Sequence, residues 1–140
     1  MKTSCIIILI ALLSACQPEL TTPVNPADAS NVDLTGLTPL KSGMFVGIGG
    51  HTAAGTVLIY EKNSKKYIVF DPYSSQAGPD LKVYLSKDEN ASDYIRVGKL
   101  QSTTGRQTYE VVGNPEIDQY PFVHIWCEQF SVEFARAPLN

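Results

Sequence analysis

Apolar and polar residues alternate along most of the chain after residue 40, in short segments rich in β-branched and aromatic side chains. Successive side chains of a β-strand point to opposite faces, so this alternation predicts strands. The predicted strands cover residues 44–48, 55–60, 66–70, 81–85, 94–97, 107–112, 121–127 and 130–134. In the last of these, Phe130, Val132 and Phe134 share one face, and we expect all three to pack inward.

Turn-forming residues separate the predicted strands, and no segment predicts a helix. The turns contain Asn63, Asp71-Pro72, Gly78-Pro79, Gly105 and Gly113-Asn114-Pro115. Strands this short, separated by such turns, predict one all-β domain: an antiparallel β-sandwich of about 8–10 short strands.

The amino-terminal segment has the features of a processing signal. Lys2 precedes an apolar run over residues 5–13, which is shorter than the roughly 20 residues of a membrane-spanning helix. Leu13-Ser14-Ala15-Cys16 resembles a bacterial lipobox, which implies cleavage of a lipoprotein signal peptide at residues 1–15 and acylation of Cys16. The first expected partner is therefore membrane lipid, bound through Cys16. Gln17, rather than Asp, follows the cysteine, and this favours a lipid-anchored position in the bacterial cell envelope, at the outer membrane.

The next segment has the composition of a tether. Of the nine prolines, four lie in residues 17–40, where no aromatic residue occurs, so we expect residues 16–40 to be an acylated, Pro-rich spacer and residues 41–140 to be the folded domain. The formal charge of −3 leaves no surplus of Lys and Arg to neutralise a phosphate backbone, so no nucleic-acid partner is expected.

Several segments of the predicted domain resemble the DM13 family, which accompanies DOMON domains in animal proteins. The resemblance rests on Phe45 and on HTAAGTVLI at 51–59, GPDLKVYLS at 78–86, GKL at 98–100, GRQTY at 105–109 and VHIWCEQFSVEFARAPL at 123–139. It implies electron transfer or redox modification at a cell surface, through the family cysteine that corresponds to Cys127. That cysteine acts either as a bare thiol or as a ligand to a group such as haem. No DOMON or cytochrome segment accompanies the domain, so we expect the electron donor to be another molecule.

The three cysteines have different expected fates. Cys5 leaves with the signal peptide and Cys16 is acylated, so Cys127 is the expected free thiol of the mature chain. A redox role requires solvent to reach Cys127 at the end of its strand, with His51 as the favoured partner. Two alternatives remain open: Cys127 is a small buried residue that packs beside Val123 and Ile125, or it is a ligand for a metal or haem, with the cofactor unknown.

The chain contains the residue types that bind copper, but their spacing in the sequence does not suit a copper site. His51, His124, Cys127 and Met44 would supply the ligand types of a blue-copper site. Positions 124 and 127 differ by an odd number, however, so on a regular strand their side chains leave opposite faces. The spacing therefore disfavours copper.

Two functional hypotheses follow. The first is a lipid-anchored redox or electron-transfer module centred on Cys127, with an envelope redox protein as its unknown partner. The second is a non-catalytic binding or scaffolding β-sandwich at the outer membrane. The sequence favours either kind of module over a stand-alone enzyme.

Overall fold

The computed structural model describes residues 29–140. The predicted signal peptide 1–15, Cys16 and the first part of the predicted tether lie outside the described residues. The strands are β1 Lys41–Met44, β2 Val46–Gly47, β3 Ala53–Lys62, β4 Lys65–Ser75, β5 Leu81–Ser86, β6 Tyr94–Lys99, β7 Gln107–Val111, β8 Phe122–Cys127 and β9 Val132–Pro138. The one helical element of this part of the chain is the short 3₁₀ turn η1, Ile117–Gln119.

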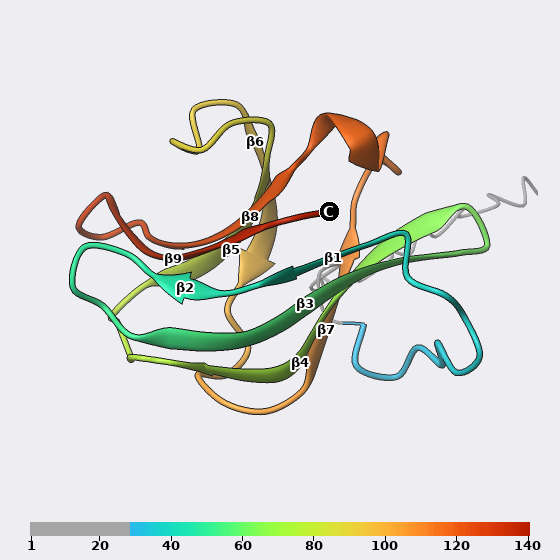
Figure 1. Ribbon diagram of the computed structural model, residues 1–140, viewed down its shortest axis with the longest axis horizontal. Helices are drawn as coiled ribbons and strands as arrows, with labels where there is room; N and C mark the ends of the chain where they lie inside the picture. Colours follow the sequence, from blue (N-terminus) through green and yellow to red (C-terminus); the bar gives the residue numbers. More distant parts are fainter. Residues whose placement is uncertain (1–28) are drawn as a thin grey trace, which may run out of the picture.

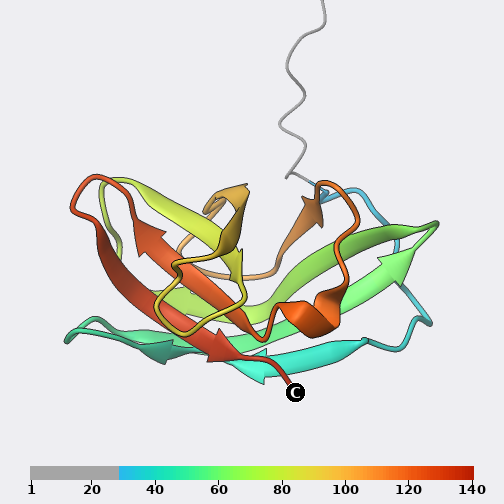
Figure 2. The same ribbon diagram turned by 90° about the horizontal axis from the view of Figure 1, so that it is seen from above.

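The strands form two antiparallel sheets that pack face to face (Figures 1 and 2). One sheet has the order β1-β3-β4-β7 and the other the order β2-β9-β8-β5-β6. The predicted all-β antiparallel sandwich is therefore confirmed. Between residues 29 and 140, no helix is long and apolar enough to cross a bilayer.

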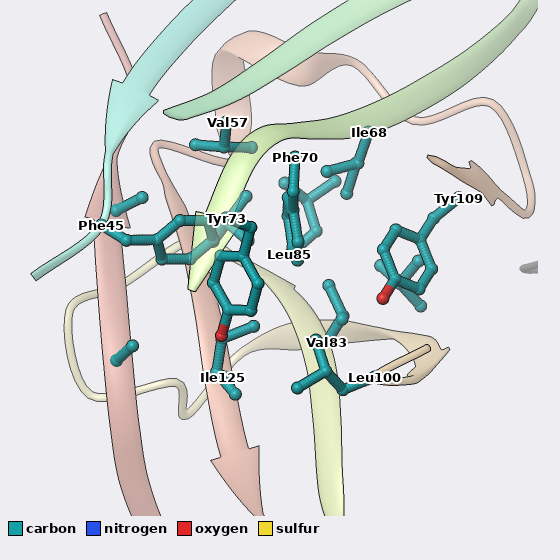
Figure 3. Packing of buried hydrophobic residues seen from close by; sticks show 14 of the residues in the cluster. Phe45, Val57, Ile68, Phe70, Tyr73, Val83, Leu85, Leu100, Tyr109 and Ile125 are labelled. Carbon is teal, nitrogen blue, oxygen red and sulfur yellow. The ribbon is translucent and has the colours of Figure 1, made fainter. Parts of the chain in front are cut away.

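The predicted strand at 44–48 is two strands in different sheets. The chain leaves β1 of one sheet and enters β2 of the other at Phe45, whose amide donates to the Gly55 carbonyl at 2.9 Å. The Phe45 ring enters the core, where its centroid lies 4.8 Å from that of Phe70 and 5.0 Å from that of Tyr73 (Figure 3). The crossing point therefore contributes one of the central aromatic side chains of the core.

The β8–β9 hairpin departs from simple alternation. Phe134 is buried, but Phe130 is 61% exposed and Val132 is 40% exposed, so the expectation that all three pack inward is wrong for two of them. Residues 128–131 form a turn, with Ser131 in the left-handed region at φ 52°. A bulge in β9 then turns two successive residues, Phe134 and Ala135, into the core.

Residues 29–40, assigned to the tether from sequence, pack against the four-stranded sheet. Leu34 is buried against Tyr67 and Val69, on the face of β4 that points away from the main core. The Leu40 amide donates to the Ile59 carbonyl at 2.7 Å, and the Ala29 amide donates to the Thr108 carbonyl at 3.2 Å. The packed part of the chain therefore begins before Lys41.

Candidate functional site

Cys127 is the last residue of β8, and its side chain lies in the main core. Its exposed fraction is 0%, and it shares the inner face of the strand with Val123 and Ile125. Leu81 stands directly opposite on β5, and Val132 stands opposite on β9. The expected access of solvent to the sulfur at the strand end is therefore absent, because the buried face of β8 continues to its last residue.

His51 lies in the turn between β2 and β3, and its contacts are with Phe134 and Gln76. Its ring stacks on Phe134, with 3.7 Å between centroids and 12° between planes. Its Nδ1 lies 3.4 Å from Oε1 of Gln76. His51 therefore covers a core residue of the strand that neighbours β8, and within the described chain no hydrogen bond or ring contact joins it to the thiol.

A surface hollow approaches the core at Leu81, the residue opposite Cys127. Its volume is about 400 Å³, and Gly78, Pro79 and Leu81 line one part of it. Gly78 has no room for a side chain, since an added Cβ would lie 2.8 Å from the ring of Phe134 and 2.9 Å from Cδ2 of Leu81. Leu81 and Phe134 thus close the core tightly at this end of the sandwich.

The surroundings of Cys127 do not fit a haem or a metal in this arrangement. The sulfur is enclosed by apolar core side chains, so a haem could reach it only by displacing them. The residues of the copper set point in different directions: Met44 is 71% exposed, and His124 lies on the outer face of the sheet that has Cys127 on its inner face. Among residues 29–140, no group of three or more His, Cys, Asp or Glu side chains is arranged to hold a metal ion.

The outer face of the five-stranded sheet presents a row of stacked aromatic rings. Tyr84 stacks on Tyr94 of β6, with 4.0 Å between centroids and 13° between planes. On its other side, the Trp126 ring lies at 6.1 Å and 18°. Alternation along each strand predicts that these three side chains point away from the core. Their proximity to one another depends on the order of β6, β5 and β8 in the sheet, which alternation does not predict.

Glu128 connects this row to a charged group. It accepts a hydrogen bond from the Tyr84 hydroxyl at 2.8 Å, and two from Arg96 at 2.6 and 3.1 Å. The Arg96 guanidinium lowers the pKa of Glu128 to about 2, against a smaller opposing effect of burial. Burial, followed by the contact with the Glu128 carboxylate, raises the pKa of Tyr84 above its ordinary value.

His124 is also fully buried, on the outer face of the sheet. Its Nδ1 lies 2.5 Å from Glu133 Oε1, and its Nε2 lies 3.3 Å from the Asp88 carbonyl. Arg136 holds the same carboxylate through two hydrogen bonds, at 2.9 and 2.8 Å. Burial favours a higher pKa for Glu133, but the hydrogen bonds from Arg136 and His124 outweigh it and leave the pKa below its ordinary value.

The sequence model of one family, described as electron transfer DM13, matches residues 45–139. The match spans β2 to β9 and includes both His51 and Cys127. No curated protein and no solved structure matches the chain.

Proposed function

Because this chain belongs to the electron transfer DM13 family, we propose that it is an electron-transfer module of the bacterial cell envelope with Cys127 as its redox group. The observation that carries this proposal is the family match, which covers β2 to β9 and extends past Cys127. We propose that His51 controls access to the thiol through its stack on Phe134.

We further propose that an acylated Cys16 holds the module at the outer membrane. The support is the lipobox-like Leu13-Ser14-Ala15-Cys16, followed by Gln17. An extended chain spans about 3.3–3.6 Å per residue, so residues 17–28 can separate the domain from the lipid by at most about 40 Å.

The burial of Cys127 determines how its thiol can react. Thiol–disulfide exchange requires contact between two sulfur atoms, and the closed sandwich does not permit that contact. Reaction therefore requires a local opening at the end of the core that Leu81 and Phe134 close. Because we expect no second thiol in the mature chain, the oxidised product is a sulfenic acid or a mixed disulfide with a partner thiol.

The test uses the full-length chain in detergent with the substitutions Cys5→Ser and Cys16→Ser, so that Cys127 is the only thiol. The protein is treated with hydrogen peroxide, which oxidises a thiolate to sulfenic acid and is reduced to water, and a sulfenic-acid probe is read by mass spectrometry. We expect labelled Cys127 in protein whose circular dichroism stays native. A thiol that stays reduced until denaturant unfolds the chain would contradict the proposal.

The complete burial of the sulfur supports a second candidate, a non-catalytic binding or scaffolding module. In that case Cys127 only fills space, and Cys127→Ser lowers the free energy of unfolding by about 1–3 kcal/mol, because a hydroxyl is left without a partner. A Cys127→Ser chain that keeps every envelope interaction of the parent favours this candidate. Loss of redox activity with the fold and the interactions retained favours the first.

A further inference from the structure

We propose that Tyr94, Tyr84 and Trp126 form a one-electron relay on the outer face of the five-stranded sheet, with Glu128 as the proton acceptor for Tyr84. The oxidant is a strong one-electron acceptor of the metal-centre class in another protein, such as a ferryl haem, because the oxidation of tyrosine requires a higher potential than ferric haem or Cu(II) sites supply. This inference rests on the proposed electron-transfer function and names the side chains through which the domain meets its redox partner.

The register of the sheet brings the three rings together. Tyr84 lies opposite Arg96 on one side and opposite His124 on the other, so Tyr94 and Trp126 are its diagonal neighbours on β6 and β8. Diagonal neighbours in a sheet are within reach of aromatic side chains. The Tyr84 ring therefore has aromatic neighbours on both adjacent strands at small interplanar angles, which allows an electron to pass from ring to ring.

The row leads from the surface to the strand that bears the thiol. Tyr94 is 43% exposed and belongs to β6, the edge strand of its sheet, whereas Tyr84 is only 3% exposed. Trp126 immediately precedes Cys127 in β8, and the two side chains leave opposite faces of the strand. An acceptor docked at the sheet edge can therefore withdraw an electron close to Cys127 without any solvent contact of the sulfur.

The hydroxyl of Tyr84 has a proton acceptor in place. It donates to Oε1 of Glu128 at 2.8 Å, and Arg96 donates to the same oxygen through Nε and to Oε2 through Nη2. A tyrosine phenol is neutral at physiological pH, and burial with the Glu128 contact raises the pKa of Tyr84 further, so its oxidation releases a proton together with the electron. An oxidised phenol is a strong acid, and it can protonate even a carboxylate of low pKa.

The step is balanced in atoms and electrons. Tyr84 loses one electron to the acceptor, which is reduced by one unit, and the phenolic proton moves from the Tyr84 oxygen to Glu128. The products are a neutral tyrosyl radical, a Glu128 carboxylic acid and the reduced acceptor. Re-reduction by one electron returns the proton to Tyr84.

The experiment generates tris(bipyridine)ruthenium(III) with a laser flash in the presence of the full-length protein in detergent. Electron paramagnetic resonance and transient absorption then detect tyrosyl and tryptophanyl radicals. We expect a tyrosyl radical in the parent chain, its loss in Tyr84→Phe, and an unchanged yield in the control Tyr60→Phe, which alters β3 of the other sheet. An equal tyrosyl yield in Tyr84→Phe would overturn the proposal.

Glu128→Gln tests the proton acceptor, since glutamine keeps the shape of the side chain but is a far weaker base. We expect the tyrosyl yield to fall and a tryptophanyl radical to accumulate, and we expect Glu128→Asp to restore the tyrosyl radical. Tyr94→Phe, which changes an exposed ring and retains the stack, should slow the oxidation of Tyr84 in a chain that folds normally. Unchanged radical kinetics in both Glu128→Gln and Tyr94→Phe would show that the row only packs.

One further variant separates this inference from the proposed function. If Cys127 is redox-inert but the relay exists, Cys127→Ser still forms the Tyr84 radical. If the relay is absent but Cys127 is the redox group, Tyr84→Phe still forms sulfenic acid with hydrogen peroxide. Failure of the radical experiment and failure of the sulfenic-acid experiment can therefore be distinguished.

Discussion

The ring of His51 lies flat on the ring of Phe134, with 3.7 Å between their centroids, and so covers the core beside the strand that ends at Cys127. Stacked aromatic pairs contribute about 0.5–1.5 kcal/mol. We predict that His51→Ala accelerates the labelling of native Cys127 by a thiol reagent by a factor of about 2–10. This factor is the rate change that corresponds to the loss of about 0.5–1.5 kcal/mol of stacking energy. His51→Phe preserves the stack and should label at the parent rate; a slow rate in both variants would mean that the stack does not control access.

Leu81 lines the surface hollow and stands opposite Cys127, so its truncation should open a route from the hollow to the thiol. Leu85 is the matched control, because it is a buried leucine on the same face of the same strand but lies opposite Val123. Each truncation to Ala is expected to lower the free energy of unfolding by about 2–5 kcal/mol.

We predict that Leu81→Ala labels at least about tenfold faster than Leu85→Ala, since a factor of ten corresponds to 1.4 kcal/mol of local opening. Labelling rates are measured under native conditions, beside urea unfolding of each variant. Equal rates in the two variants would show that the thiol becomes reachable only through general loosening of the core.

His124 connects two strands and a loop. Its two ring nitrogens lie within hydrogen-bond distance of Glu133 Oε1 and of the Asp88 carbonyl oxygen. We predict that His124→Gln lowers the free energy of unfolding by about 1–3 kcal/mol, because buried polar groups lose a partner. Urea unfolding of His124→Gln, Glu133→Gln and the double variant should give a coupling energy of about 0.5–3 kcal/mol. Simple additivity would contradict the proposed pair.

The carboxylates of Asp88 and Glu128 predict loss of stability in acid. Amide hydrogen bonds from Asp93 and Ser92 lower the pKa of Asp88 to about 2, and Arg96 lowers that of Glu128 to about 2. Because both pKa values are lower in the folded chain than in the unfolded chain, their stabilisation is complete above the unfolded values of 3.8 and 4.5 and disappears as pH falls towards about 2.

The melting temperature should therefore fall between neutral pH and pH of about 2, and it should fall less steeply in Glu128→Gln, which has one fewer titrating carboxylate. Thermal unfolding followed by circular dichroism across this pH range checks the prediction. If the melting temperatures of the parent and of Glu128→Gln fell in parallel as pH is lowered, Glu128 would not contribute to the pH dependence of stability.

The sequence predicted the strands well because one face of each sheet is buried and the alternation records that face. It failed where backbone geometry interrupts the alternation. The chain changes sheets at Phe45 within one predicted strand, and the turn at Ser131 with the following bulge leaves Phe130 and Val132 exposed. These features depend on long-range pairing, which no local pattern contains.

The sequence also identified Cys127 as the central residue without predicting its surroundings. The burial of its sulfur follows from the opposing sheet and from Phe134, which enters the core through the bulge. The aromatic row and the His124 contacts depend on strands β5, β6, β8 and β9 lying side by side. The residues of the aromatic row and of the His124 contacts come from different strands, so their proximity can be predicted only when the strand order is known.

The central claim is that Cys127 reacts from the folded protein, and the denaturant dependence of its labelling tests this most directly. In the Cys5→Ser, Cys16→Ser chain, the free energy of opening at Cys127 is measured from labelling rates at increasing urea and compared with the free energy of global unfolding. We predict an opening free energy that is smaller than that of global unfolding and nearly independent of urea. An opening free energy equal to that of global unfolding, with the same urea dependence, would contradict the claim and leave Cys127 as a core residue.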